Sequence, residues 1–254
     1  MRLIFDTHAH YDDSAFDEDR DILLQHILET SVCKIVNQGT DLVSSRFSLE
    51  LAEKYDGVYA AVGLHPEYLT ENSIGDIEHI RQLAAHPKAV AIGEIGLDYY
   101  YDVPRDLQKK VFAQQLLLAE ELSMPVNIHD REAHGDMLEM LQKYKPKGIL
   151  HCFSGSVEMA KAVVKLGMSI GIGGVVTFKN ARKTVDVVRE IPLEKIVLET
   201  DCPYLTPVPF RGKRNDSSYI SFAAQRIAEI KNVTAEEVMK ITKTNAEMIY
   251  NVSS

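Results

Sequence analysis

Short runs rich in valine and isoleucine alternate along this chain with longer stretches in which apolar residues recur at every third or fourth position. Runs of the first kind are typical of buried strands, and stretches of the second kind predict amphipathic helices. We expect eight strands, at residues 2–7, 34–39, 58–64, 89–95, 125–129, 147–152, 168–173 and 195–201. Helical spacing lies between them, most clearly at 41–54, 106–123 and 157–166.

The order of strands and helices indicates the fold class. Strands that are largely apolar and each followed by a helix indicate a parallel sheet that is covered on both faces. Eight such units in 254 residues favour an α/β fold of the (β/α)8 TIM barrel type, with a doubly wound open sheet as the alternative. No Pro/Gly/Ser-rich linker, charge block or low-complexity tract divides the chain. We therefore expect residues 1–254 to form a single barrel domain.

Composition narrows the function classes. Hydrophobic residues make up 45% of the chain, which is enough for a sizeable core, and the formal net charge is −9. This charge argues against a basic surface that wraps long duplex nucleic acid, although it permits metal ions that attract phosphate locally. The three cysteines, Cys33, Cys152 and Cys202, lack CxxC spacing, which argues against a disulfide framework or a thiolate zinc site.

The chain shows no secretory leader and no apolar stretch near the ~20 residues that span a bilayer. With unpaired cysteines as well, this pattern predicts a cytoplasmic protein that does not contact membranes. No feature of the sequence indicates an obligate protein partner.

Ionisable residues gather at the ends of the predicted strands. In a (β/α)8 barrel the carboxyl ends of the strands meet at one rim, where the reacting groups lie. At or just after these ends stand His8, His10, His65, Glu94, His129, His151, Glu199 and Asp201. A lone histidine is usually structural, and we assign that role to the histidines on predicted helices or their ends. These are His26, His79, His86 and His134. Several imidazoles and acids at one rim instead indicate a metal site.

The number of candidate ligands predicts how many ions bind. A catalytic zinc ion uses about three protein ligands and keeps one open position. Six side chains qualify here: His8, His10, Glu94, His129, His151 and Asp201. Six ligands favour two divalent ions about 3.5–4 Å apart, joined by a bridging group. Glu94 lies between the two sets of histidines in chain order and is the expected bridge, and these ligand types suit Zn, Mg, Mn, Co or Ni.

Six motifs resemble those of one known family. FDTHAH, GLHP, GEIGLDYY, IHDR, HCFSGS and LETDCPYL look like the motif series of the TatD family of metal-dependent hydrolases, in the same order and at full spacing. The resemblance runs from residue 3 to about residue 210, and TNAEMIY near the C-terminus is also similar. It implies an amidohydrolase-like barrel and a metal-dependent deoxyribonuclease, with 3′-exonuclease activity in some members.

The resemblance also implies how the ligands are shared between two ions. One ion would be held by His8, His10, Glu94 and Asp201, and the other by Glu94, His129 and His151. Other amidohydrolase-like barrels carry a modified lysine on the fourth strand, where this chain has Glu94. This difference disfavours a urease-like or dihydroorotase-like enzyme.

Such a hydrolase would use metal-bound water as its nucleophile, because a divalent ion lowers the pKa of that water to about 7. We expect three catalytic residues: Asp201, which can ligate an ion and accept the proton of the water, Glu94 as the bridge, and Glu199, which would orient a ligand or the water. The alternatives are a cap of the next turn for Asp201 and a buried ion pair for Glu199. Asp6 would orient an imidazole or cap a backbone group.

Three residues near the strand ends are expected to contact phosphate. His65 and Arg131 project from neighbouring strand ends, although Arg131 could instead pair with Glu132 on the surface. Ser154 lies in a glycine turn before a helix that starts near Ser156, where backbone N–H groups bind anions. Helix capping explains the two serines equally well.

Aromatic and basic side chains add a weaker nucleic-acid signal. Tyr204, like Tyr99 and Tyr100, would stack on a base of a single strand or pack in the core. The 207–216 loop carries cations that would guide a nucleic-acid strand or form a solvated turn. They are Arg211, Lys213 and Arg214.

Three functions remain open from the sequence. The first is a metal-dependent exonuclease that acts on DNA, as single strands or frayed 3′ ends. The second keeps the metals and changes the bond, as in a D-aminoacyl-tRNA deacylase or another ester or amide hydrolase, because fold and ligands do not determine the substrate. The third is a catalytically silent barrel that serves as a scaffold, which the complete ligand set disfavours.

Overall fold

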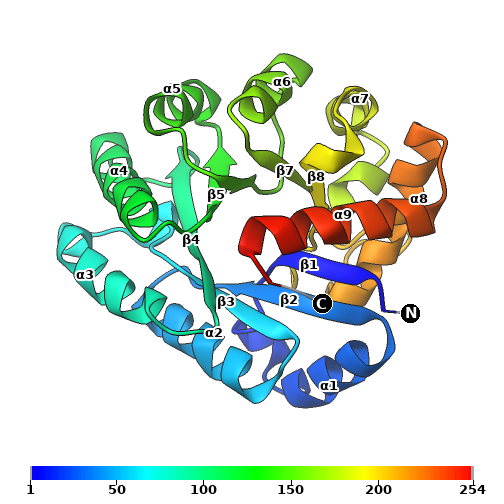
Figure 1. The fold of residues 1–254 in the computed structure, drawn as a ribbon, viewed down its shortest axis with the longest axis horizontal. Coiled ribbons are helices and arrows are strands. Elements are labelled where there is room, and N and C mark those ends of the chain that lie inside the picture. The colour runs from blue at the N-terminus through cyan, green and yellow to red at the C-terminus, as the bar shows by residue number, and fades with distance from the viewer. Residues whose placement is uncertain (1, 253–254) are drawn as a thin grey trace.

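The computed structural model of this protein describes residues 2–252. Within them, one parallel sheet runs in chain order through β1 (Ile4–Ala9), β2 (Val32–Gln38), β3 (Val58–Val62), β4 (Ala89–Asp98), β5 (Val126–Arg131), β6 (Gly148–Leu150), β7 (Ser169–Ile172) and β8 (Ile196–Leu198). The sheet closes beside β8, where the amide of Asp201 donates to the carbonyl of His8 and the amide of His10 donates to the carbonyl of Cys202, both at 2.9 Å. The strands therefore form a barrel (Figure 1), which confirms the predicted TIM barrel against the open sheet.

Helices surround the barrel (Figure 1). They are α1 (Arg20–Thr30), α2 (Leu42–Lys54), α3 (Ser73–Ala84), α4 (Arg105–Glu121), α5 (His134–Tyr144), α6 (Val157–Lys165), α7 (Arg182–Glu190), α8 (Ile220–Lys231) and α9 (Ala235–Tyr250). Short 3-10 helices are η1 (Ser14–Phe16), η2 (Pro66–Tyr68), η3 (Gly174–Thr177), η4 (Leu193–Lys195) and η5 (Ser217–Tyr219). Asp41 and Ser44 form a capping box that starts α2, and Ser156 starts α6 by accepting the amide of Met159 at 3.2 Å.

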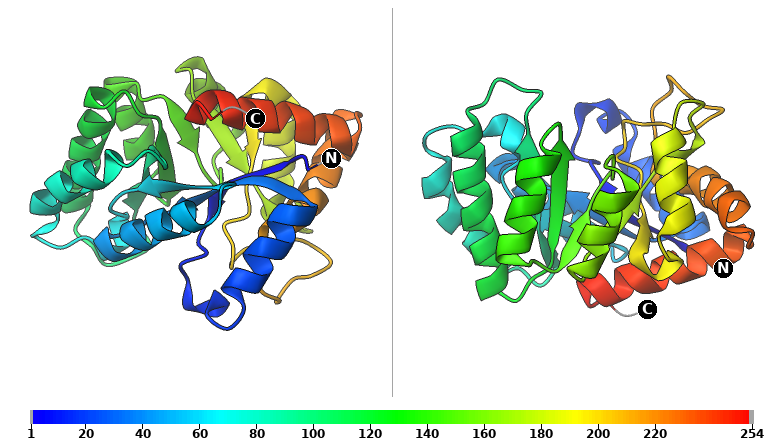
Figure 2. Two further views of the ribbon diagram at one scale, coloured as in Figure 1. Left: turned by 60° about the horizontal axis from the view of Figure 1, so that its bottom comes forward. Right: turned by 90° about the horizontal axis from the view of Figure 1, so that it is seen from above.

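The two ends of the barrel differ in what covers them. Helix α9 packs against β1 and β8. Figure 2 shows the segments that follow β1 and β8 at the end of the barrel away from α9. Because that is the end at which the strands finish, the long connections there can surround a site.

Strand β4 is longer than predicted. Its pairing with β5 continues through Gly96 and His129 to Asp98 and Arg131, three residues past the expected end. Gly96 permits this continuation, because it adopts a φ of +147° and a Cβ there would lie 2.0 Å from the carbonyl oxygen of His129. The extension places Asp98 on the same strand face as Glu94.

The strands are buried on both faces, as their apolar sequences predict. Every residue of β1 is buried, and side chains such as Ile35, Ile92 and Ile128 are fully inaccessible. Each such side chain stabilises the fold by about 1.5–3 kcal/mol relative to exposure. The barrel is therefore a rigid support for the residues at its rim.

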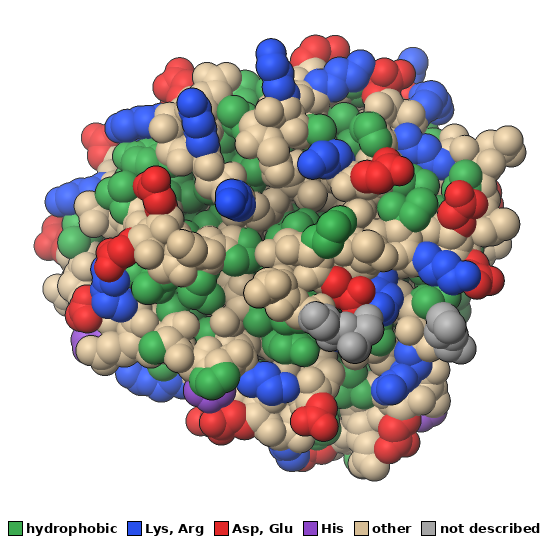
Figure 3. Space-filling model, viewed as in Figure 1, with side chains coloured by type: hydrophobic (Ala, Val, Ile, Leu, Met, Phe, Trp, Pro, Cys, Tyr) green, Lys and Arg blue, Asp and Glu red, His purple; other side chains and the backbone are tan. Residues whose placement is uncertain are grey.

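The outer surface mixes charges of both signs. Figure 3 shows Lys and Arg side chains interspersed with Asp and Glu on the face that carries α9. Across residues 2–252, no helix is both long enough and apolar enough to cross a lipid bilayer.

Candidate metal centre

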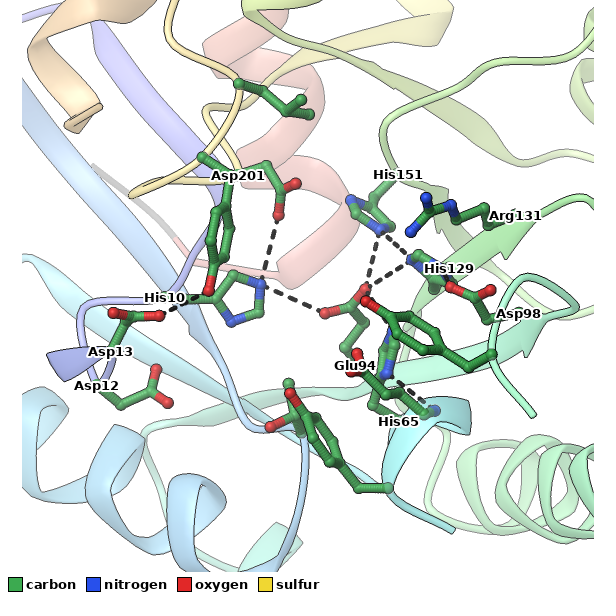
Figure 4. Close-up of a pocket in the computed structure, with 16 residues that line it drawn as sticks. His10, Asp12, Asp13, His65, Glu94, Asp98, His129, Arg131, His151 and Asp201 are labelled. Atoms are coloured by element: carbon green, nitrogen blue, oxygen red, sulfur yellow. Dashed lines mark hydrogen bonds and ion pairs between the residues drawn. The ribbon is translucent and has the colours of Figure 1, made fainter. Parts of the chain in front are cut away.

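The carboxyl ends of the strands surround a pocket of about 410 Å³ (Figure 4). Five predicted ligands line it, namely His10, Glu94, His129, His151 and Asp201. The sixth, His8, is fully buried beside them. The pocket is also lined by Asp12, Asp13, Thr40, His65, Glu67, Tyr68, Asp98, Tyr101, Arg131, Tyr204 and Leu205. The fold thus brings all six predicted ligands together from β1, β4, β5, β6 and β8 or the segments that follow them.

One group of possible ligand atoms lies where β1 meets the segment after β8. The Nε2 atoms of His8 and His10 are 3.1 Å apart. Oε2 of Glu94 lies 3.3 and 3.4 Å from these two nitrogens, and Oδ1 of Asp201 lies 3.5 and 3.4 Å from them. Tetrahedral ligands 2.0–2.2 Å from an ion are about 3.3–3.6 Å from one another. The spacing of this group therefore suits a divalent cation.

A buried amide, that of Asn127, determines which ring nitrogen of neutral His8 carries the proton. Oδ1 of Asn127 lies 3.2 Å from Nδ1 of His8. The amide nitrogen of Asn127 donates to the carbonyl of Thr7 at 3.0 Å and to the hydroxyl of Tyr250 at 3.1 Å, so its oxygen faces the imidazole. Nδ1 of neutral His8 must then carry the proton, and Nε2 presents a lone pair to the group. A buried set of facing acceptors is stable only with a proton or a cation between them.

A second group of possible ligand atoms surrounds the other oxygen of Glu94. Oε1 lies 3.1 Å from Nδ1 of His129 and 2.9 Å from Nε2 of His151, and these two nitrogens are 3.2 Å apart. Nε2 of His129 donates to Oδ2 of Asp98 at 2.9 Å, so that the neutral ring presents its Nδ1 lone pair inward. Glu94 thus faces both groups, as Figure 4 shows.

His65 differs from these histidines because it points a proton, and not a lone pair, toward Glu94. Its Nδ1 accepts the backbone amide of Glu67 at 3.2 Å, so the neutral ring carries its proton on Nε2. That Nε2 lies 3.4 Å from Oε1 of Glu94 and acts as a donor rather than as a ligand. Burial lowers the pKa of His65, which favours this neutral form.

Burial and the neighbouring ionisable groups both shift the pKa values of this cluster. Burial raises the pKa of Glu94, but the surrounding histidines, His65 foremost, hold it well below its usual range. Burial lowers the pKa of His129, but its hydrogen bonds to Asp98 and Glu94 raise it to about 9. For His151, burial and the neighbouring His8 lower the pKa to about 4. A protonated His129 carries a hydrogen on the Nδ1 atom that a metal would use, so cation binding there must displace that proton.

Glu199 lies behind the pocket and does not line it. Its side chain is buried, Oε1 accepts the amide of Cys152 and lies 3.9 Å from Nδ1 of His151, and burial raises its pKa well above the usual range. Neither Oε2 of Glu199 nor Nδ1 of His151 has a hydrogen-bond partner among the described residues. Gly171 makes room for this carboxyl, since a Cβ there would lie 2.0 Å from Oε2.

The structure favours the simpler alternative for Asp6 and Ser156, and for Ser154 it supports neither the phosphate contact nor the helix cap. Asp6 does not contact an imidazole. It accepts the amide of Thr200 at 3.0 Å and the hydroxyls of Thr200 and Ser217 at 2.6 and 2.7 Å, and so it anchors the segment after β8. Ser154 is exposed and does not line the pocket, and Ser156 caps α6. The chain turns away there because the amide of Phe153 pairs with β7 at Gly171.

The candidate substrate contacts divide between the pocket and the outer surface. Arg131 and Tyr204 line the pocket, whereas Tyr99 turns outward and donates to Asp136. The loop cations lie away from the pocket: the guanidinium of Arg211 stands 3.9 Å from the Phe178 ring centre, that of Arg214 makes two 2.7 Å contacts with Asp19, and the ammonium of Lys213 lies 5.6 Å from the ring of Phe210. The proposal that this loop guides a strand therefore has no support from its geometry.

The contact between His129 and Asp98 leads to a testable prediction. Oδ1 of Asp98 accepts the amide of Tyr100 at 2.9 Å while Oδ2 accepts from His129, so an asparagine must turn an NH2 group toward one of the two donors. We expect Asp98→Asn to weaken divalent-metal affinity about 10- to 100-fold. Titration calorimetry measures this, with Asp186→Asn, an exposed aspartate paired with Arg189, as the control. Unchanged affinity in Asp98→Asn would show that Asp98 does not orient the ring.

The chain is similar to known proteins along nearly its whole length. The family model for TatD related DNase matches residues 5–251. The uncharacterized metal-dependent hydrolase YabD of Bacillus subtilis is 43% identical, over 99% of this chain and 100% of its own. The 3′-5′ ssDNA/RNA exonuclease TatD of Escherichia fergusonii is 34% identical, over 98% and 100%. The crystal structure of YjjV, a TatD homologue of Escherichia coli, superposes with a TM-score of 0.93 at 34% identity and covers 99% of both chains.

Proposed function

Because this chain belongs to the TatD family of metal-dependent hydrolases, we propose that it removes nucleotides from the 3′ ends of single-stranded DNA by metal-assisted hydrolysis. The observation that carries the proposal is the buried carboxylate of Glu94, whose two oxygens each face a separate group of histidine nitrogens. A carboxylate shared in this way is typical of sites that hold two metal ions.

We assign each group to one divalent ion. His8, His10, Glu94 and Asp201 would hold one ion, and Glu94, His129 and His151 the other. When bound, such a pair lowers the pKa of water and withdraws charge from a phosphoryl group.

The side chains around the two groups supply the remaining steps. Asp201 is partly open to the pocket, with a side chain that is 19% exposed, and it is placed to accept the proton of the attacking water. The Nε2–H of His65 and the guanidinium of Arg131 are the donors available for the phosphate oxygens. Glu199 holds the segment after β6 through the amide of Cys152, which positions His151.

The proposal that the substrate is a phosphodiester rests on the hydrogen-bond donors of the pocket and on the name of one relative. Arg131 places a permanent cation in a pocket that is otherwise lined by acids, histidines and neutral groups, and guanidinium groups bind phosphate oxygens well. A relative that covers the whole length is named a single-strand exonuclease. A deacylase for D-aminoacyl-tRNA would use the same ions. Only assays with each of the two substrates can therefore distinguish the activities.

The test compares the two substrates directly. Purified protein is incubated with a single-stranded oligonucleotide that is labelled at either end, and separately with a D-aminoacyl-tRNA, with and without Mg, Mn or Zn. We expect stepwise release of mononucleotides from the 3′ end only when metal is present. Deacylation with an intact oligonucleotide would replace the exonuclease by an ester hydrolase, and failure to bind metal would indicate a silent barrel.

A further inference from the structure

Three tyrosines at the mouth of the pocket have no part in the chemistry proposed above. Tyr68, Tyr101 and Tyr204 line the pocket from three separate connections, which follow β3, β4 and β8. They are 55%, 37% and 55% exposed. Large side chains that stay exposed together beside a pocket indicate a binding surface.

Contacts at the mouth hold two of these rings. The hydroxyl of Tyr204 donates to Oδ2 of Asp13 at 2.7 Å. The ring of Tyr68 lies 5.9 Å, centre to centre, from the imidazole of His65, whose Nε2 is 3.4 Å from Glu94. Aromatic surface therefore extends from the mouth to the residues that surround the candidate metal positions.

The charges of the pocket limit how a nucleic acid can bind. Among the described residues that line it, Arg131 is the sole Lys or Arg, and its guanidinium lies 3.8 Å above the ring of Tyr100. Figure 4 shows Arg131 on the opposite side of Glu94 from Asp12 and Asp13, so one side can receive a phosphate and the other cannot. Binding along many phosphates needs a row of cations. This pocket offers contact for one phosphate outside the metal positions.

The volume of the pocket leads to the same conclusion as its charges. The volume of about 410 Å³ lies within the range of about 300–1,000 Å³ that is typical of small-molecule sites. Such a pocket suits one nucleotide with its base unstacked from its neighbours, and it is too small for a duplex. Tyrosine rings bind an unstacked base of any sequence by stacking, because every base has a π face.

We propose that Tyr68, Tyr101 and Tyr204 form a subsite that binds the unstacked base at the end of a single strand, while Arg131 holds an adjacent phosphate. This proposal rests on the exonuclease activity proposed above. The base supplies most of the affinity for the terminal nucleotide, and the strand beyond it contributes little. A base-paired end must fray before it can enter.

The experiment compares two oligonucleotides that differ only in whether the 3′-terminal residue carries a base or is abasic. We expect the wild-type protein to cleave the base-bearing end with a kcat/KM about 5- to 150-fold higher, which is the contribution of one stacked base. Tyr68→Ala and Tyr204→Ala should each reduce this ratio at least about threefold, and Tyr204→Phe, which keeps the ring, should retain it. Tyr55→Ala is the matched control, because Tyr55 also donates to an aspartate, Asp21, but does not line the pocket.

The outcomes separate the two proposals. If neither oligonucleotide is cleaved in the presence of metal, the exonuclease activity itself fails. If both are cleaved equally by the wild type, or if the tyrosine variants slow both reactions by the same factor, the base subsite is wrong. Thermal unfolding must show that each tyrosine variant is folded, because a variant that merely loses structure would also change both rates together.

Discussion

Replacing Glu94 by glutamine is expected to lower kcat/KM for single-stranded DNA at least about 10³-fold. Both oxygens of Glu94 face histidine nitrogens, at 3.3 and 3.4 Å on one side and 3.1 and 2.9 Å on the other. Glutamine turns an NH2 group toward one of these sets and removes the negative charge, so at least one ion loses a ligand. The loss of metal stabilisation in the transition state amounts to several kcal/mol, and each 1.36 kcal/mol is about a tenfold change in rate.

Metal binding gives a second measurement of the same variant that does not depend on the substrate. In the wild type, a divalent ion at 100 times its Kd should raise the free energy of unfolding by about 2.7 kcal/mol, and this stabilisation should be reduced in Glu94→Gln. Thermal unfolding with and without metal measures the difference. Glu190→Gln, an exposed glutamate paired with Lys161, is the control. If Glu94→Gln kept the full metal stabilisation and the full rate, Glu94 would not be part of the metal centre.

The barrel could be predicted because its physical signal is repeated. All eight expected strands are present, and the histidines assigned to helices lie there: His26 within α1, His79 within α3, His134 at the start of α5 and His86 just after α3. Parallel strands that are buried on both faces need apolar residues at nearly every position, which leaves a clear pattern in the sequence. Because the fold brings all strand ends to one rim, residues far apart in sequence could be grouped without knowing any distance.

The residues that orient the candidate ligands were not predicted, and the reasons lie in the strands. Asp98 stands three residues past Ile95, the expected end of its strand, and Gly96 permits the strand to continue that far. Asn127 is the second residue of β5, within its buried first half, two residues before His129 and on the same face. A buried amide needs partners, so this position carried a signal that could have been used.

The connections after the strands were the least predictable part. Strand β6 ends at Leu150, so alternation no longer sets the direction of the residues that follow, and Ser154 turns outward. Likewise Tyr68 and Tyr101 reach the pocket through loop paths that no periodic pattern specifies. Their positions depend on tertiary contacts, such as the one between Tyr68 and His65, and only the structure provides those.

Replacing Asp201 by asparagine is expected to separate metal binding from proton transfer. Oδ1 of Asp201 lies 3.5 and 3.4 Å from the nitrogens of His8 and His10, and asparagine keeps one oxygen of similar size for this position. It cannot accept a proton from water, so kcat should fall about 10²- to 10⁴-fold while KM changes little. The group formed by Glu94, His129 and His151 is untouched, and metal analysis should still find an ion there.

This combination distinguishes Asp201 from Glu94 by measurement. Glu94→Gln is expected to lose both bound metal and rate, whereas Asp201→Asn is expected to lose rate and retain metal. This difference is expected only if the carboxylate of Glu94 is shared by the two ions and that of Asp201 accepts the proton. Asp201→Ala removes the oxygen as well, and it should therefore reduce metal content in addition to kcat. If Asp201→Asn keeps more than about a tenth of the wild-type kcat, another group must accept the proton. Glu199 would not be that group, because it is buried behind His151 and does not reach the pocket.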